Sequence, residues 1–387
     1  MSRRTQTGLA LTGLILVLLI AGAAYALAAR QNSLSLQVAQ QARTVKALAQ
    51  ARALLKDYAQ SFHLVGAHAV PTPGFLPCPD GDSDGSADMS CGSAGVFAVG
   101  RFPYRTLGAE PLRDGHGECL WYAVAGNFKY NPYADRMNWD VPGQFDLRAA
   151  DGRLLNASSA PLDRAVAVVF APGPALTGQQ RSLSPNRHCN GPADAALALT
   201  NYLETAFPTP GTGTLDIEEG IRGDATNNDQ IAWLSARELF DPAFLRRPDV
   251  TTLIDGMLDT LEPALAGAPS PATPRWVAGN VVLGALPESI TDPVIERWRD
   301  QFLYLACEPG APACMTLSSS AAPLATCNAV VLFSGQAVAG AQARPGGVEA
   351  YFEAALSALP SPDSDTVVAE PVYDGRFPAR DLARCLP

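Results

Sequence analysis

The stretch that decides the organisation of the chain is Leu9–Ala29, LALTGLILVLLIAGAAYALAA. It carries no charge, and a helix of about 20 apolar residues is long enough to cross a bilayer. Arg3 and Arg4 precede it, which favours an N-terminus on the inner side of the membrane. The sequence therefore predicts a transmembrane helix over residues 9–29, in a single-pass inner-membrane protein whose large domain is periplasmic or extracellular.

A cleaved export signal is the alternative, because Ala26-Leu27-Ala28 has the small residues of a cleavage site.

The helical pattern continues beyond the apolar stretch. Residues 31–62 contain neither proline nor glycine, and their apolar residues recur at steps of three or four, the spacing of one helix face. We therefore expect residues 30–66 to continue the helix as an amphipathic segment that packs on a globular domain. A plain linker helix and a coiled coil with a partner are the alternatives.

The composition of the chain limits the number of folded units and the kinds of partner it can have. The chain has 387 residues, 47% of them hydrophobic, which suggests two or three units with real cores. The net charge of −10 argues against nucleic-acid binding, which needs clustered basic residues. Short runs rich in valine and aromatic residues predict strands at 119–125, 165–170, 302–306 and 328–333.

Two parts of the chain resemble each other. Ala165–Gly173 aligns with Ala329–Gly335, and Asn201–Ala206 aligns with Ala350–Ala355 in the same order. The predicted fold class is therefore α+β, with a helix packed on an antiparallel sheet and a second unit of the same kind in tandem. The expected divisions are a first unit at 67–240, a helix and proline-rich connector at 241–280, and a second unit at 281–387.

The cysteines indicate an oxidising compartment. All eight follow the apolar stretch, and an even number in an exported chain is typical of disulfides. Closure of short loops suggests Cys78–Cys91 and Cys307–Cys314, with Cys314–Cys327 as an alternative to the second pair.

An acidic loop matches part of a calcium-binding pattern. Asp80, Asp82 and Asp84 alternate before Gly85, and Asp88 follows at the ninth position. Position twelve of the pattern is Cys91 instead of the usual glutamate, so the set of calcium ligands in the loop would be incomplete. Calcium bound by Asp80, Asp82, Asp84 and Asp88 is one interpretation, and a solvated acidic turn is the other.

Enzymatic motifs are absent from the sequence: it has no G-x-S-x-G, H-E-x-x-H or phosphate-binding loop. The densest group of ionisable residues is Arg113–Glu118, in which we expect Asp114 to bond a turn. We therefore predict a protein that is not an enzyme and has no catalytic residues.

The N-terminus resembles that of type IV pilins and type II secretion pseudopilins, since Arg3, Arg4 and Gly8 precede an apolar helix that runs into an amphipathic half. The order LPCPD at 76–80, TLG at 106–108 and LWYAV at 120–124 resembles that of large pilin-like bacterial proteins. The resemblance covers roughly residues 1–240.

The resemblance implies that residues 1–8 are a prepilin-type leader, cleaved between Gly8 and Leu9. It also implies a minor pilin or pseudopilin, assembled with other pilins through its N-terminal helix. Gly13 stands where the family usually has a glutamate, which fits a minor subunit. The alternative is an inner-membrane-anchored periplasmic module for binding or adhesion that never enters a filament.

Overall fold

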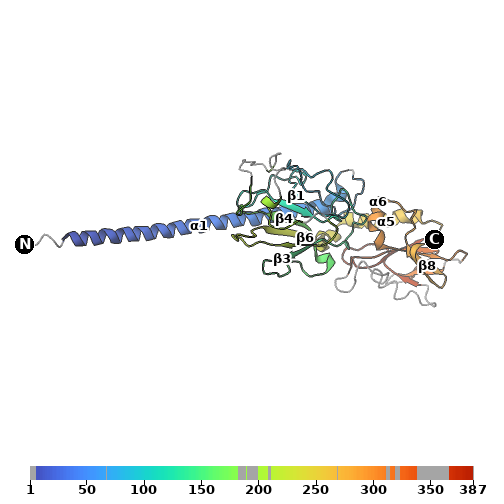
Figure 1. Ribbon diagram of the computed structural model, residues 1–387. Coiled ribbons are helices and arrows are strands. Elements are labelled where there is room, and N and C mark those ends of the chain that lie inside the picture. Colours follow the sequence, from blue (N-terminus) through green and yellow to red (C-terminus); the bar gives the residue numbers. More distant parts are fainter. Residues whose placement is uncertain are drawn as a thin grey trace, which may run out of the picture.

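A long helix leaves one end of the molecule, and β8 and the C-terminus lie towards the other end (Figure 1). The computed structural model describes residues 6–66, 68–181, 189, 199–207, 211–267, 269–310, 314–318, 323–337 and 366–386. The helix, α1 (Gln6–Ser61), has 56 residues. It ends in a short 3-10 turn, Phe62–Leu64, and Gly66 then adopts a left-handed conformation that stops helical continuation.

The two halves of α1 have different surroundings. Its C-terminal half packs on strands β4 and β6 of the first sheet. The side chains at this contact recur every three or four positions and are at most 7% exposed: Ala47, Leu48, Ala51, Leu55 and Ala59. The small alanines let the helix backbone approach the sheet closely, as the amphipathic pattern predicts.

The N-terminal half of α1 has no such cover. Within the described residues, no helix combines the length and hydropathy that a membrane crossing requires. The predicted transmembrane helix over 9–29, and with it the single-pass inner-membrane localisation, is therefore wrong.

The first sheet has six strands, ordered β1-β2-β4-β3-β5, with β6 paired to β4. Its strands are β1 (Ala98–Arg101), β2 (Trp121–Val124), β3 (Phe145–Arg148), β4 (Ala165–Ala171), β5 (Leu215–Glu218) and β6 (Gln230–Ser235). All seven residues of β4 are buried, and α1 packs on this central strand.

Three helices lead from the first sheet to the second part of the chain: α3 (Ala236–Leu239), α4 (Pro242–Leu245) and α5 (Pro248–Ala264). Ser235 and Glu238 form a capping box on α3, and the carboxylate of Asp241 caps α4. Each cap fixes a sharp change of direction between consecutive helices.

Two further sheets follow, a five-stranded one ordered β14-β12-β9-β8-β7 and a three-stranded one ordered β11-β10-β13. Their elements are β7 (Ala272–Ala278), β8 (Val281–Ala285), α6 (Pro293–Trp298), β9 (Phe302–Cys307), β10 (Met315–Ser318), β11 (Pro323–Cys327), β12 (Ala329–Phe333), β13 (Thr366–Val368) and β14 (Leu382–Leu386). Strand β7 pairs with β8, so the range 241–280, expected to be a helix and connector, also contributes a strand to this sheet.

The arrangement corrects the predicted fold class. The α+β content is present, but the strands form three sheets and not one antiparallel sheet per unit. Two of the pairings, β3 with β5 and β10 with β13, are parallel. The packing of a single helix on a single antiparallel sheet, which the pilin-like prediction requires, is therefore wrong for this chain.

The two large sheets share one strand order. In the first, β1, β2, β4 and β6 are successive antiparallel neighbours, and in the second β8, β9, β12 and β14 are. Helix α1 lies on β4 and β6, while α5 lies on β12 and β14. Residues 350–355, on which part of the predicted duplication rests, lie outside the described residues, so the duplication stays a prediction.

The two sheets share one hydrophobic core, which runs from Ala47 on α1 to Leu386 on β14. At their junction the rings of Trp139 and Trp298 meet edge to face at 4.8 Å. The indole nitrogen of Trp298 donates to the hydroxyl of Thr72 over 2.8 Å. The expected units at 67–240 and 281–387 are thus joined by buried apolar contacts.

Candidate functional site

The acidic loop follows directly from the pairing of Asp80 with Arg101 at the edge of the first sheet. The loop then folds back under Tyr104. Gly85 has a φ of 89°, and a Cβ at this position would lie 2.5 Å from the ring of Tyr104. Only glycine satisfies both the left-handed backbone and this close approach, so the turn of the loop is fixed by its sequence.

Asp80 is the organising residue of the loop. It is 1% exposed, and its two carboxylate oxygens accept from the backbone N–H groups of Asp84 (3.1 Å) and Gly85 (2.7 Å). Burial raises the pKa of Asp80 to about 6, and the nearby Asp84 carboxylate adds to this rise, while the backbone N–H groups oppose it. A cation beside Asp80 would compensate the charge that burial disfavours.

Three of the four predicted ligands converge. One carboxylate oxygen each of Asp80, Asp82 and Asp88 lies within 4.8 Å of the others. Asp84 is not part of this group, and its carboxylate accepts from the N–H of Ser86 at 2.6 Å. Oxygen ligands in this number suit calcium, which completes its shell with backbone oxygens and water. Cys91, at position twelve, lies in a disulfide and offers no ligand.

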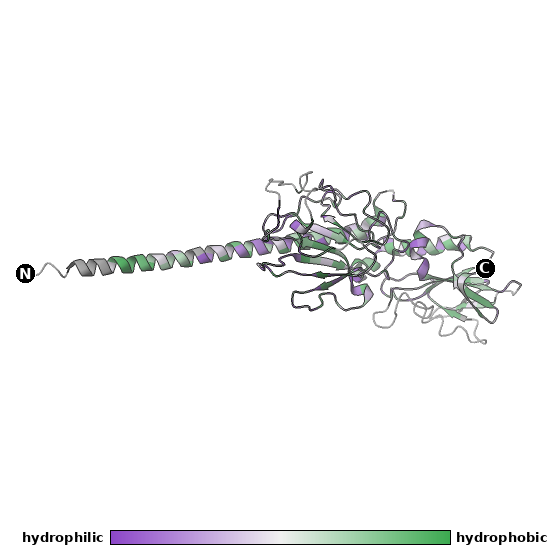
Figure 2. Cartoon of the chain, viewed as in Figure 1, coloured by the Kyte–Doolittle hydropathy of each residue, from purple (hydrophilic) through white to green (hydrophobic). Residues whose placement is uncertain are grey.

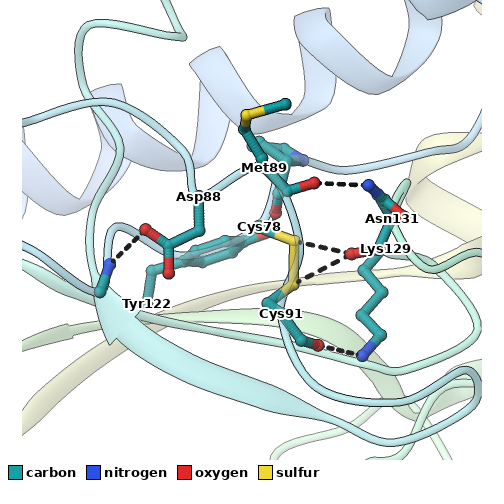
Figure 3. Close-up of a disulfide and its surroundings, with 9 residues drawn as sticks. Cys78, Asp88, Met89, Cys91, Tyr122, Lys129 and Asn131 are labelled. Atoms are coloured by element: carbon teal, nitrogen blue, oxygen red, sulfur yellow. Dashed lines mark hydrogen bonds between the residues drawn. A yellow bond between two sulfur atoms is a disulfide. The ribbon is translucent and has the colours of Figure 1, made fainter.

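A disulfide closes the loop, as the sequence predicts. Cys78 and Cys91 are joined with their Cα atoms 5.8 Å apart, and the carbonyl of Asn131 lies beside both sulfurs (Figure 3). The ammonium of Lys129 donates to the carbonyl of Cys91. Burial lowers the pKa of Lys129 to about 8. The disulfide and the buried amine of Lys129 together hold the end of the acidic loop against residues 129–131.

The remaining cysteines also pair. Cys307 bonds Cys314, the second predicted pair, and the long-range pairs are Cys119–Cys189 and Cys327–Cys385. The prediction of disulfides in this chain is confirmed. Disulfides persist in oxidising compartments and not in a reducing cytosol.

The group Arg113–Glu118 forms a turn packed on α1. The carboxylate of Asp114 accepts from the backbone N–H groups of His116 (2.8 Å), Glu118 (2.9 Å) and Gly173 (2.8 Å). Asp114 therefore bonds the turn and ties it to the end of β4. His116 is exposed at the tip of the same turn.

The expected processing residues lie in α1. Gly8 and Leu9 fall within its backbone, and their side chains are outside the described ones, as are residues 1–5 of the leader. Beyond them, α1 carries exposed large apolar side chains, and the cartoon of this part of the helix is coloured hydrophobic (Figure 2). Their exposures range from 49% to 79% over Leu14, Ile15, Leu16, Val17, Leu18, Leu19, Ile20, Tyr25, Leu27, Leu34, Leu36 and Val38.

Sequence reasoning missed two sites that depend on tertiary contacts. A pocket of about 510 Å³ lies at the junction of the two large sheets and is lined by Asp135, Arg136, Asp140 and Asp300, among others. Burial, followed by the nearby Asp140 carboxylate, raises the pKa of Asp300, although Arg136 at 3.6 Å opposes the rise. No local motif marks these residues, because they come from a loop and from the segment after α6.

The second is the buried carboxyl group of Asp229, which lies beside the half-buried Glu204. Asp229 is fully buried and accepts from the backbone N–H of Glu204 at 2.8 Å. Burial, followed by the charge of Glu204, raises the pKa of Asp229 to about 8.

No family model, curated protein or solved structure matches this chain.

Proposed function

We propose that this chain is a non-enzymatic minor subunit of a type IV pilus or a type II secretion-like filament, and that it joins the filament through the N-terminal half of α1. The observation that carries the proposal is the exposed apolar stretch from Leu14 to Leu27 on α1, with Leu34, Leu36 and Val38 exposed beyond it. Monomeric soluble proteins rarely leave a continuous apolar surface of this kind, so a partner surface is required.

The two halves of α1 would have different roles in such a subunit. The C-terminal half is fixed to β4 and β6, so the exposed half is held in line with the head (Figure 1). Packing against the helices of neighbouring subunits would remove the apolar side chains from water, at about 25 cal/mol per Å² buried. The bulky head suits a minor position better than a repeating shaft.

Cysteine crosslinking tests this function. All eight native cysteines are in disulfides, so a new cysteine gives an unambiguous signal. Leu16→Cys and Leu19→Cys should crosslink to helices of other subunits in assembled filaments, whereas a cysteine in place of exposed Met89 in the head should not. N-terminal sequencing after co-expression with prepilin peptidase should give Leu9 as the first residue. An intact Met1 together with absent helix crosslinks would refute the proposal.

We further propose that the acidic loop binds calcium through Asp80, Asp82 and Asp88. The convergence of their oxygens and the burial of Asp80 support this. Calorimetric titration of calcium into the full chain should show binding that Asp82→Asn weakens at least about tenfold, because one anionic ligand is lost. Asp84→Asn, which lies outside the converging group, should weaken binding much less than Asp82→Asn does. Flat titrations for the unsubstituted chain and both variants would show that the acidic loop does not bind calcium.

A binding or adhesion module outside any filament is the second candidate, and the junction pocket favours it. Asp135, Arg136 and Asp300 offer both donors and acceptors to a polar ligand such as a saccharide, and ligand pockets often form where two units meet. This candidate predicts that Arg136→Ala abolishes binding of envelope polysaccharide and that an unrelated helix can replace residues 6–40 without loss.

A further inference from the structure

The junction pocket, with a volume of about 510 Å³, has more acidic than basic groups in its lining. Its carboxyl groups belong to Asp135, Asp140 and Asp300, and the one basic group among the described lining residues is the guanidinium of Arg136. Asn127 adds a side-chain amide. The lining therefore favours a ligand that is positively charged and that also forms hydrogen bonds.

The protein itself holds two of these carboxyl groups in place. Asp140 accepts from the side-chain amide of Gln301 at 3.1 Å. One oxygen of Asp300 accepts from the side-chain amide of Asn138 at 2.9 Å, and the other lies 3.6 Å from a guanidinium nitrogen of Arg136. The fold therefore sets the positions of both carboxyl groups before any ligand binds.

Arg136 does not neutralise Asp300. Its side chain is more than half exposed, and the 3.6 Å between the two groups is too long for a hydrogen bond. Burial, followed by the nearby Asp140 carboxylate, disfavours the negative charge of Asp300 and raises its pKa. An ammonium group beside Asp300 would offset both effects.

The spacing of the acids favours an organic cation over a metal ion. A metal ion needs several ligand oxygens around one point. In the described part of the chain, only Asp80, Asp82 and Asp88 bring three carboxylate oxygens within 4.8 Å of one another, and the acids of the junction pocket do not. The pocket volume lies within the roughly 300–1,000 Å³ of sites for small organic ligands, so the cation has room to be an ammonium on a larger molecule.

We infer that the junction pocket binds a saccharide that carries a protonated amine, and that the ammonium group pairs with Asp300. Sugar hydroxyls need both donors and acceptors, which the guanidinium of Arg136, the amide of Asn127 and the carboxylate of Asp135 supply. Among the described residues, neither Asp135 nor Asn127 has a hydrogen bond or an ion pair, so both can turn to a ligand. The inference rests on the second candidate of the proposed function and names the class of its ligand.

The test titrates two disaccharides into the full chain by calorimetry, in a polyoxyethylene detergent that has no sugar head group to compete. Chitobiose, the glucosamine disaccharide with free amines, is used at a pH at which those amines are protonated. Cellobiose is the same disaccharide with hydroxyls in place of the amines. Chitobiose should bind at least about tenfold more tightly than cellobiose, because only chitobiose brings an ammonium group to Asp300.

Asp300→Asn should remove this preference and leave the affinity for cellobiose unchanged, since asparagine keeps an acceptor for Asn138 and loses only the charge. A thermal melt checks that this variant is folded. Asp135→Asn should weaken chitobiose binding by a smaller factor, because Asp135 is exposed and water screens its charge. Asp151→Asn, on an exposed turn outside the pocket, is the matched control and should bind both sugars as the unsubstituted chain does.

Equal affinities for the two sugars, both abolished by Arg136→Ala, would overturn the inference and leave the saccharide candidate standing. No binding of either sugar would overturn both. A preference for chitobiose that Asp300→Asn and Asp135→Asn both retain would place the amine elsewhere and would overturn the inference as well. The cysteine crosslinks of α1 report on the filament function independently of these titrations.

Discussion

At the scale of single residues, the pKa of an aspartate in this protein depends on whether the side chain is buried. Asp80 and Asp229 are ordinary loop aspartates in the sequence, yet both are withdrawn from water and have raised pKa values. Asp82, two residues from Asp80, is exposed. The acidic pattern around Asp80 could be read from the sequence, whereas the burial of Asp80 and of Asp229 could not, because it depends on chain segments far away.

Asp229 gives a prediction for the pH dependence of stability. Its pKa is raised to about 8 on folding, so between about pH 4 and pH 8 the folded chain keeps a proton that the unfolded chain releases. The stabilisation from this group is present at low pH and lost as the pH rises through 8. Asp229→Asn mimics the protonated carboxyl and should reduce the fall in unfolding free energy between pH 5 and pH 8 by about 3 kcal/mol.

Urea unfolding at the two pH values measures this change. Asp57→Asn on the exposed face of α1 serves as the control and should leave the pH dependence as it is. An unchanged slope in Asp229→Asn would show that Asp229 titrates normally in the folded chain.

At the scale of elements, α1 is one helix whose two halves have different surroundings. Its buried face is made largely of alanine, and Ala51 is fully buried against the first sheet. Periodicity predicted this face correctly, because side chains at steps of three and four lie on one side of any helix. It could not show which part of α1 the head covers, since that depends on where the sheet ends.

A larger side chain at Ala51 should disturb the packing of the C-terminal half of α1 on the first sheet. Ala51→Leu adds volume where the helix touches β4 and β6 and should lower the unfolding free energy by about 1–3 kcal/mol. Ala49→Leu, on the exposed side of the same turn, should change it by less than about 0.5 kcal/mol. Thermal melts of the two variants measure this difference. Equal losses of stability in both would mean that Ala51 does not pack on the first sheet.

At the scale of the whole molecule, the shared core makes the two large sheets one folding unit. Trp139 and Trp298 meet at the junction, and Asn138 donates to Asp300 across it at 2.9 Å. We therefore expect a single cooperative unfolding transition. Trp298→Ala should cost about 3–5 kcal/mol, because it empties a fully buried site.

Calorimetry distinguishes this from two independent units. The unsubstituted chain should give one transition whose calorimetric and van't Hoff enthalpies agree. Two transitions in the unsubstituted chain would show that the sheets unfold separately despite the contacts between them.

The sequence by itself determined features that depend on near neighbours: the helical periodicity of α1, the turn at Asp114 and the short-loop disulfide Cys78–Cys91. It left Cys307–Cys314 as one of two short-loop pairings for Cys314. Backbone spacing and the low entropy cost of closing short loops act within a few residues, so they can be read locally. Only the tertiary structure decided the parallel pairing of β3 with β5, the disulfide Cys119–Cys189 and the junction pocket. Each joins segments many residues apart, and their pairing is selected by the burial of the whole core rather than by any local pattern.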